Sequence, residues 1–85
     1  STTIASRGLK SAKPTGNECI RVMQEGVRAY FLESLAQIDH LNMYGSFHKK
    51  GWTSSLALQT VNELVPTIIR TVTLAWYYAA EKAKQ

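Results

Sequence analysis

The feature that most constrains the fold of this 85-residue chain is a proline-free stretch at residues 17–44. Its apolar side chains recur every third or fourth residue, which is the spacing of one face of an α-helix. They are Ile20, Met23, Val27, Phe31, Leu35, Ile38 and Leu41. With Gly26 as its only glycine, the stretch predicts a single helix of roughly 40 Å, at about 1.5 Å per residue. Further apolar residues, Cys19 and Tyr30 among them, widen this face, so we expect the helix to have partners on more than one side.

Length and composition favour a small ordered domain that relies on association. A chain of 85 residues can build only a thin hydrophobic core by itself. Its 45% hydrophobic and 19% charged residues argue against disorder outside the ends. The net charge of +4 fits a polyanionic partner without requiring one. The single cysteine, Cys19, excludes an internal disulfide and is expected in the core.

The flanking segments contain recognisable helix boundaries. Thr15 followed by Glu18 has the form of a capping box, and a short helix is possible at residues 3–12, before Pro14. Gly45 is expected to end the long helix, with a loop running to Gly51. These boundaries predict an all-α chain with an arm and truncated first helix at residues 1–16, a core at 17–65 and a C-terminal helix at 66–85.

Two further expectations concern the second half of the chain. Thr53 or Ser54 can cap the helix that follows the loop. Pro66 is expected to start a separate helix, because proline is accepted in a first turn but breaks a helix interior. We expect Trp76, Tyr77 and Tyr78 to pack that last helix against the domain.

The sequence gives no support for an enzyme, a cofactor or a membrane protein. It contains no glycine-rich phosphate loop and no HExxH, CxxC or GxSxG motif. His40 and His48 lack a convincing set of partner ligands, so no metal site is predicted. The most apolar stretch, residues 56–80, is interrupted by Glu63, Pro66 and Arg70, which opposes a membrane span. The first sixteen residues lack the apolar run of a signal peptide.

Several segments, in order, resemble the core histone 2B family. Leu9-Lys10 and Pro14-Thr15-Gly16 are similar to the end of that family's first helix, and Val22-Met23, Val27, Phe31 and Glu33 are similar to its central helix. Lys49-Lys50 occupies the place of a Lys-Arg pair. The most specific segment is residues 55–66, SLALQTVNELVP, which resembles the family's SREIQTAVRLLLP with one residue fewer.

The resemblance implies a histone fold: a short helix, a long central helix and a short helix, followed by a C-terminal helix. It implies pairing with a histone 2A-like chain through the apolar residues of 17–44, and DNA wrapping through phosphate contacts that do not read the bases. The DNA-binding residues it implies are Arg7, Lys10, Lys13, Thr15, Gly16, Asn17, Lys49, Lys50, Gly51, Thr53 and Ser54. A contact with a histone 4-like partner would use Tyr44, Leu58, Val61 and Leu64.

Departures from the family keep other interpretations open. There is no long lysine-rich tail, and Thr67-Ile68-Ile69-Arg70 replaces the glutamates that contribute to the nucleosome acidic patch. A viral or protist histone, located in chromatin or in a virion, is one hypothesis. A histone-fold scaffold in a transcription or kinetochore complex is a second, and a helical-hairpin subunit of an oligomer that does not bind DNA is a third.

Overall fold

The structure is a computed structural model that describes residues 12–85, and every regular element in that range is helical. The elements are α2 (Gly16–Glu25), α3 (Val27–His40), α4 (Met43–Lys50), α5 (Ser54–Gln59), the π-helical turn η1 (Thr60–Leu64) and α6 (Val65–Ala83). The prediction of an all-α chain is confirmed for these residues. The arm and first helix predicted within residues 1–16 lie largely outside the described range.

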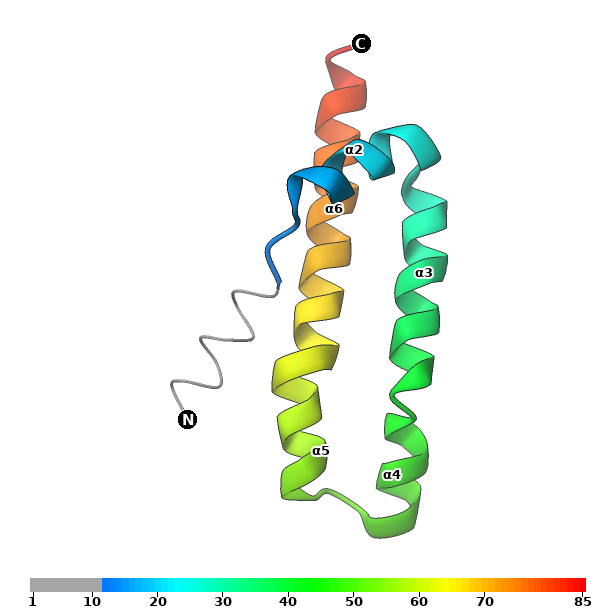
Figure 1. Cartoon of the computed structure of the whole chain (residues 1–85), viewed down its shortest axis with the longest axis vertical. Helices are drawn as coiled ribbons and strands as arrows, with labels where there is room; N and C mark the ends of the chain where they lie inside the picture. Colours follow the sequence, from blue (N-terminus) through cyan, green and yellow to red (C-terminus); the bar gives the residue numbers. More distant parts are fainter. Residues whose placement is uncertain (1–11) are drawn as a thin grey trace.

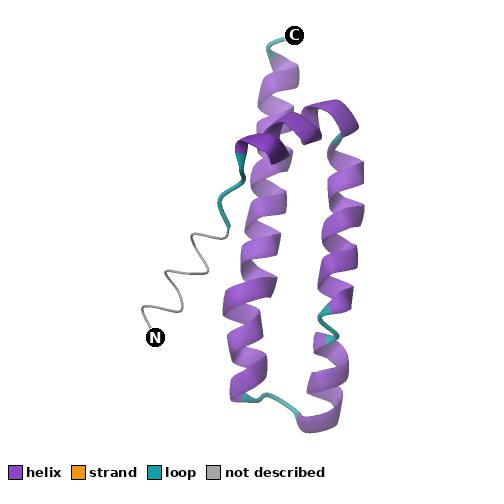
Figure 2. Ribbon diagram, viewed as in Figure 1, coloured by secondary structure: helices purple, strands orange, loops and turns teal. Residues whose placement is uncertain are grey.

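The helices form a long hairpin whose two arms run side by side (Figure 1). One arm consists of α3 and α4, and the other of α5, η1 and α6 (Figure 2). The arms are joined at one end by the turn between α4 and α5, while α2 crosses α6 near the other end. The molecule is therefore elongated, with extents of 49 × 27 × 17 Å.

The prediction of one helix through residues 17–44 is wrong. The chain turns sharply at Gly26, whose φ of 93° and ψ of 161° separate α2 from α3. Such a backbone conformation is accessible to glycine because it has no Cβ. A second interruption occurs at Asn42, which adopts the left-handed conformation with φ 52°. The long central helix that the histone resemblance implies is thus replaced by three shorter helices.

The predicted helix starts are more accurate than the predicted ends. Thr15 and Glu18 form the expected capping box: the Glu18 N–H donates to Thr15 Oγ1 at 3.2 Å, and the Thr15 N–H donates to Glu18 Oε1 at 2.9 Å. Thr53 caps α5 by accepting the Leu56 N–H at 3.1 Å. Gly45, expected to end a helix, instead lies inside α4, and the predicted loop is mostly helical as far as Gly51.

The prediction for Pro66 is correct in part. Pro66 lies in the first turn of α6, as expected, but it does not start a separate element, because α5, η1 and α6 continue one another with helical backbone angles. The turn before it is widened, and the Val65 N–H donates to Thr60 O, five residues earlier. Proline lacks an N–H and clashes with the carbonyl four residues before it. The π-turn inserts one extra residue at this place in the helix, which relieves the clash.

The hydrophobic core is small and lies where α2, α3 and α6 meet. Val22, Tyr30 and Leu74 are its buried centre. Cys19 packs against it, as predicted, together with Met23, Val27, Tyr77 and Tyr78. Trp76 does not, because it is 74% exposed, so its predicted packing role is wrong while those of the two tyrosines are confirmed.

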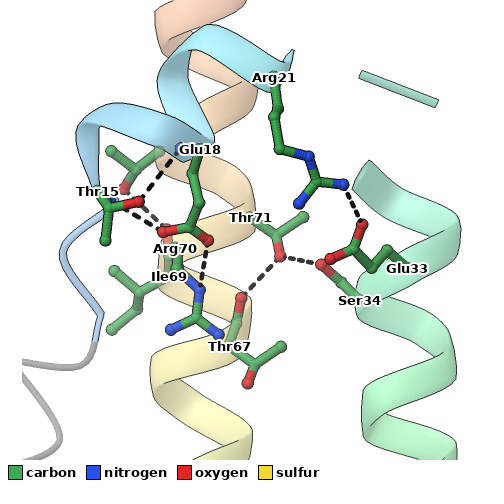
Figure 3. A network of polar contacts seen from close by, with 10 residues as sticks. Thr15, Glu18, Arg21, Glu33, Ser34, Thr67, Ile69, Arg70 and Thr71 are labelled. Carbon is green, nitrogen blue, oxygen red and sulfur yellow. Dashed lines mark hydrogen bonds and ion pairs between the residues drawn. The ribbon is translucent and has the colours of Figure 1, made fainter. Parts of the chain in front are cut away.

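Polar contacts fix α2 to both arms at this end of the hairpin (Figure 3). Glu18 forms an ion pair with Arg70 of α6 at 3.5 Å. Arg21 bridges Glu25 and Glu33, at 2.9 and 3.1 Å, and its guanidinium lies 5.2 Å from the centre of the Tyr30 ring. The Glu25 hydrogen bond is the largest of the interactions that raise the pKa of Arg21.

Candidate functional site

The most distinctive surface of the hairpin is an apolar groove between α3 and α6. Phe31, Leu35 and Ile38 line it from α3, and Ile68 and Val72 line it from α6. The groove has a volume of about 220 Å³, and none of the described residues that line it is charged. An uncharged hollow between two helices is suited to receiving apolar side chains.

Two hydroxyls at the base of this groove join the arms. Ser34 of α3 and Thr71 of α6 are hydrogen-bonded to each other. Thr71 also donates to Thr67 O at 2.8 Å, so Ser34 is the donor in the pair. Because both hydroxyls form hydrogen bonds within the chain, the groove does not require a polar ligand to satisfy them.

The apolar character extends beyond the groove along the arm formed by α5, η1 and α6. Exposed apolar side chains occur over almost the whole arm, and within α6 they recur every third or fourth residue. They are Leu58, Val61, Val65, Ile68, Val72 and Trp76, with exposed fractions between 37% and 74%. We call these six residues, together with Phe31, Leu35 and Ile38, the apolar face.

A second groove opens between the same two arms, and its lining residues occupy other sides of α3 and α6 than the residues of the apolar groove. It measures about 660 Å³, and although apolar atoms make up most of its surface, Glu33, Gln37, His40, Glu63 and Arg70 are among its lining residues. We call it the polar groove after these side chains. The Oδ1 atom of Asn62, from η1, is buried there without a hydrogen-bond partner among the described residues. Within residues 12–85, no three His, Cys, Asp or Glu side chains are grouped closely enough to hold a metal ion.

The residues expected to bind DNA form two groups at opposite ends of the hairpin. Lys49, Lys50 and Thr53 line a hollow of about 410 Å³ beside the turn between α4 and α5, together with Ser46 and Ser55. Gly51 forms the turn itself, with φ 68°, and Ser54 begins α5.

The other group lies at the start of α2, at the far end from Lys49 and Lys50 (Figure 1). It comprises Lys13, Thr15, Gly16 and Asn17, while Arg7 and Lys10 fall outside the described residues. The carboxylate of Glu18 already accepts the Thr15 N–H, and it places a negative charge at the helix terminus where a phosphate was expected. The structure therefore brings Lys49 and Lys50 together beside the turn between α4 and α5. At the start of α2, the carboxylate of Glu18 competes with a phosphate.

The turn at Gly26 divides the residues predicted to form a dimer interface. Phe31, Leu35 and Ile38 lie on the apolar face, whereas Met23 and Val27 pack against the core. Ile20 is exposed on α2, and Leu41 lines the polar groove. Of the predicted interface residues, only Phe31, Leu35 and Ile38 therefore lie together on the apolar face.

The residues expected to contact a histone 4-like partner are also divided. Leu58 and Val61 belong to the apolar face, while Tyr44 is 79% exposed in the first turn of α4. Its ring stacks on His48 with the ring centres 5.9 Å apart. Leu64 is only partly exposed.

Sequence reasoning missed the contribution of α6 to the apolar face. Val65, Ile68, Val72 and Trp76 continue the spacing of Leu58 and Val61, so the pattern is visible in the sequence. It is obscured because the predicted helix boundary at Pro66 divides the pattern in two, and because Trp76 is predicted to pack the last helix against the domain.

Comparison with protein-family models, curated proteins and solved structures found no match for this chain. No helix in residues 12–85 is both long and apolar enough to cross a membrane. What the chain can do is therefore argued from its own surfaces.

Proposed function

We propose that this chain is a helical-hairpin subunit of a protein assembly, and that it binds its partner through the apolar face. The observation that carries this proposal is the uncharged groove lined by Phe31, Leu35, Ile38, Ile68 and Val72. The side chains around it are large and half-exposed, for example Leu35 at 62% and Val72 at 47%. Leaving such an extended apolar patch in water is unfavourable, and patches of this kind mark interaction surfaces.

The hairpin is suited to this role because its two arms present their apolar side chains at helical spacing. Another helix or hairpin can pack into such a surface by placing its ridges in the grooves between side chains. The small core has the same implication, since Val22, Tyr30 and Leu74 form the only buried cluster among the described residues and lie at one end. Covering the apolar face would extend the core along the remaining length of the arms.

A photo-reactive amino acid placed at position 72 tests the proposal in the cell that expresses the chain. The matched control carries it at position 37, because Gln37 lines the polar groove of the same hairpin. We expect an adduct of discrete mass from position 72 and little from position 37. The proposal fails if position 72 gives no adduct, or if both positions give the same products. Mass spectrometry of the adduct identifies the partner, whichever protein it is.

A histone 2B-like function is a second candidate, favoured by the basic hollow at the end of the hairpin. Lys49 and Lys50 lie there with the hydroxyl residues Ser46, Thr53 and Ser55, a combination suited to phosphate contacts. In this proposal the chain pairs with a histone 2A-like chain, contacts a histone 4-like partner and wraps double-stranded DNA, in chromatin or in a virion. The interrupted helix at Gly26 and Asn42 makes it the less favoured of the two.

The salt dependence of DNA affinity separates these candidates. A histone-like chain paired with a 2A-like partner should lose affinity steeply as salt rises, and Lys49→Glu with Lys50→Glu should weaken binding and flatten the slope by about two. Lys82→Glu with Lys84→Glu, at the C-terminal end of α6, is the matched control. A folded heterodimer with a flat salt response would support a histone-fold scaffold of a transcription or kinetochore complex instead. Failure to form the heterodimer would eliminate both histone alternatives.

A further inference from the structure

The size of the apolar face is close to what a stable protein interface requires. Eight of its residues are large side chains between 37% and 74% exposed. If each offers on the order of 75 Å² of apolar surface, half of a typical large side chain, the total is roughly 600 Å². A standard interface covers about 800 Å² on each partner. The apolar face with a modest rim therefore suffices for one partner of similar size.

A second copy of the same chain is well matched to this face. In a two-fold dimer the same patch lies on both sides of the interface, so it must be compatible with itself. None of the described residues lining the groove is charged, which means that two copies would bring no like charges together at the centre. Two hairpins packed in this way form a four-helix bundle, in which apolar side chains spaced by three and four residues interdigitate.

Two charged residues on α3 bear on the orientation of the two copies. Arg28 and Asp39 are both exposed on α3 and are separated by eleven positions, which is about three helical turns. They consequently lie on the same side of α3, at opposite ends of the segment that carries Phe31, Leu35 and Ile38. Neither forms an ion pair with another of residues 12–85.

An antiparallel arrangement pairs these charges. When two α3 helices cross with their two-fold axis between Phe31 and Leu35, residue numbers that sum to about 67 face each other. Arg28 then faces Asp39 of the second copy, and the same pair forms again on the other side of the axis. A parallel arrangement would instead bring like charges to the same level, Arg28 with Arg28 and Asp39 with Asp39, and would form neither ion pair.

We propose that the apolar face is occupied by a second copy of this chain, packed antiparallel so that Arg28 of each copy pairs with Asp39 of the other. This inference rests on the proposed function, because it names the partner for the same surface. It places Ser34, already bonded to Thr71, near the dimer axis. It also places Leu35 of each copy against Phe31 of the other.

Sedimentation velocity of the purified full chain across a wide range of concentration tests this inference. We expect the wild type to be dimeric and Val72→Asp to be monomeric, with its helical circular dichroism retained because Val72 is exposed. Arg28→Asp and Asp39→Arg should each weaken the dimer by about tenfold. The double variant Arg28→Asp/Asp39→Arg should restore the affinity, since it re-forms both pairs with opposite sign. Lys49→Asp, on α4, is the matched control and should have little effect.

Each contrary result has a distinct meaning. A wild-type chain that stays monomeric overturns the second copy as partner, while a position-72 adduct with another protein would leave the proposed function intact. A dimer that survives Val72→Asp overturns the use of this face. A dimer that is lost in Val72→Asp but does not respond to the charge reversals, or is not rescued by the double variant, overturns the antiparallel arrangement.

Discussion

The two ends of the hairpin are held together in different ways. At the α2 end, three helices converge on Val22, Tyr30 and Leu74, and the ion pairs of Glu18 and Arg21 connect α2 to both arms. At the end formed by α4 and α5, α4 contributes no buried residue, and Leu56 is the main buried side chain of α5. The stability of the isolated chain is therefore concentrated at one end, and the other end depends more on whatever covers the apolar face.

The largest contrast is expected from truncating one apolar side chain at each end. Leu74 is 1% exposed, whereas Phe47 of α4 is 53% exposed. Leu74→Ala should lower the free energy of unfolding by about 2–5 kcal/mol, because it leaves a cavity in the core. Phe47→Ala should change it by less than about 0.5 kcal/mol. Urea unfolding followed by circular dichroism measures both, and equal losses would show that the two ends are equally well packed.

The next effect concerns the turn that positions α2. Gly26 and Gly51 both have positive φ, 93° and 68°, where an alanine Cβ is strained at either position. Gly26→Ala should cost about 1–3 kcal/mol, because the turn it disturbs holds Val22 and Glu18 against α6. The cost of Gly51→Ala should be smaller in global unfolding, since the turn between α4 and α5 can open on its own. Chemical denaturation gives the two values, and a larger effect at Gly51 would reverse the comparison.

Burial of Tyr30 gives the α2 end a pH dependence. Its hydroxyl is buried without a hydrogen-bond partner among the described residues, and desolvation raises its pKa above the usual value near 10, with a smaller opposing effect from Arg21. The folded state thus favours the neutral phenol. The stability gained by keeping the Tyr30 phenol neutral is complete below about pH 10. It is lost as the pH rises through the raised pKa of Tyr30.

Tyr30→Phe tests this directly. It should remove that alkaline loss and, by eliminating an unpaired buried hydroxyl, raise stability by about 1 kcal/mol at neutral pH. Tyr44→Phe is the control, because Tyr44 is exposed. Ultraviolet titration of the tyrosines and urea unfolding as a function of pH provide the measurements. An unchanged alkaline transition in Tyr30→Phe would contradict the assignment.

The smallest difference should come from the two helix caps. Thr15→Ala removes the capping box of α2, and Thr53→Ala removes the hydroxyl that caps α5. Each substitution should destabilise its own helix by about 1 kcal/mol. We expect Thr53→Ala, however, to lower the free energy of global unfolding by about half as much as Thr15→Ala does. Hydrogen exchange of amides in α5 should nevertheless accelerate in Thr53→Ala. If both variants lower global stability equally, the hairpin unfolds as one unit.

Sequence reasoning was most successful where the determinant is local. The capping box at Thr15 and Glu18 and the cap at Thr53 each depend on a few adjacent residues. It was less successful for the candidate site. Phe31, Leu35 and Ile38 were predicted to be an interface, and they do line the apolar groove, but what binds there stays a prediction. The sequence analysis did not assign four other residues of the apolar face, Val65, Ile68, Val72 and Trp76, to an interface. Their pattern becomes visible only if one helix is assumed to continue through Pro66.

The sequence alone determined that residues 12–85 are helical and where α2 and α5 start, because hydrogen bonds between neighbouring residues decide those features. It did not determine that residues 17–44 would turn at Gly26, since the apolar spacing continues unchanged through that position and glycine permits either outcome. The tertiary structure decided it: folding α2 across α6 buries Val22 against Leu74 and pairs Glu18 with Arg70. A straight helix would leave those groups in water, so the burial and ion pairing that α2 achieves against α6 outweigh the continuity of the helix.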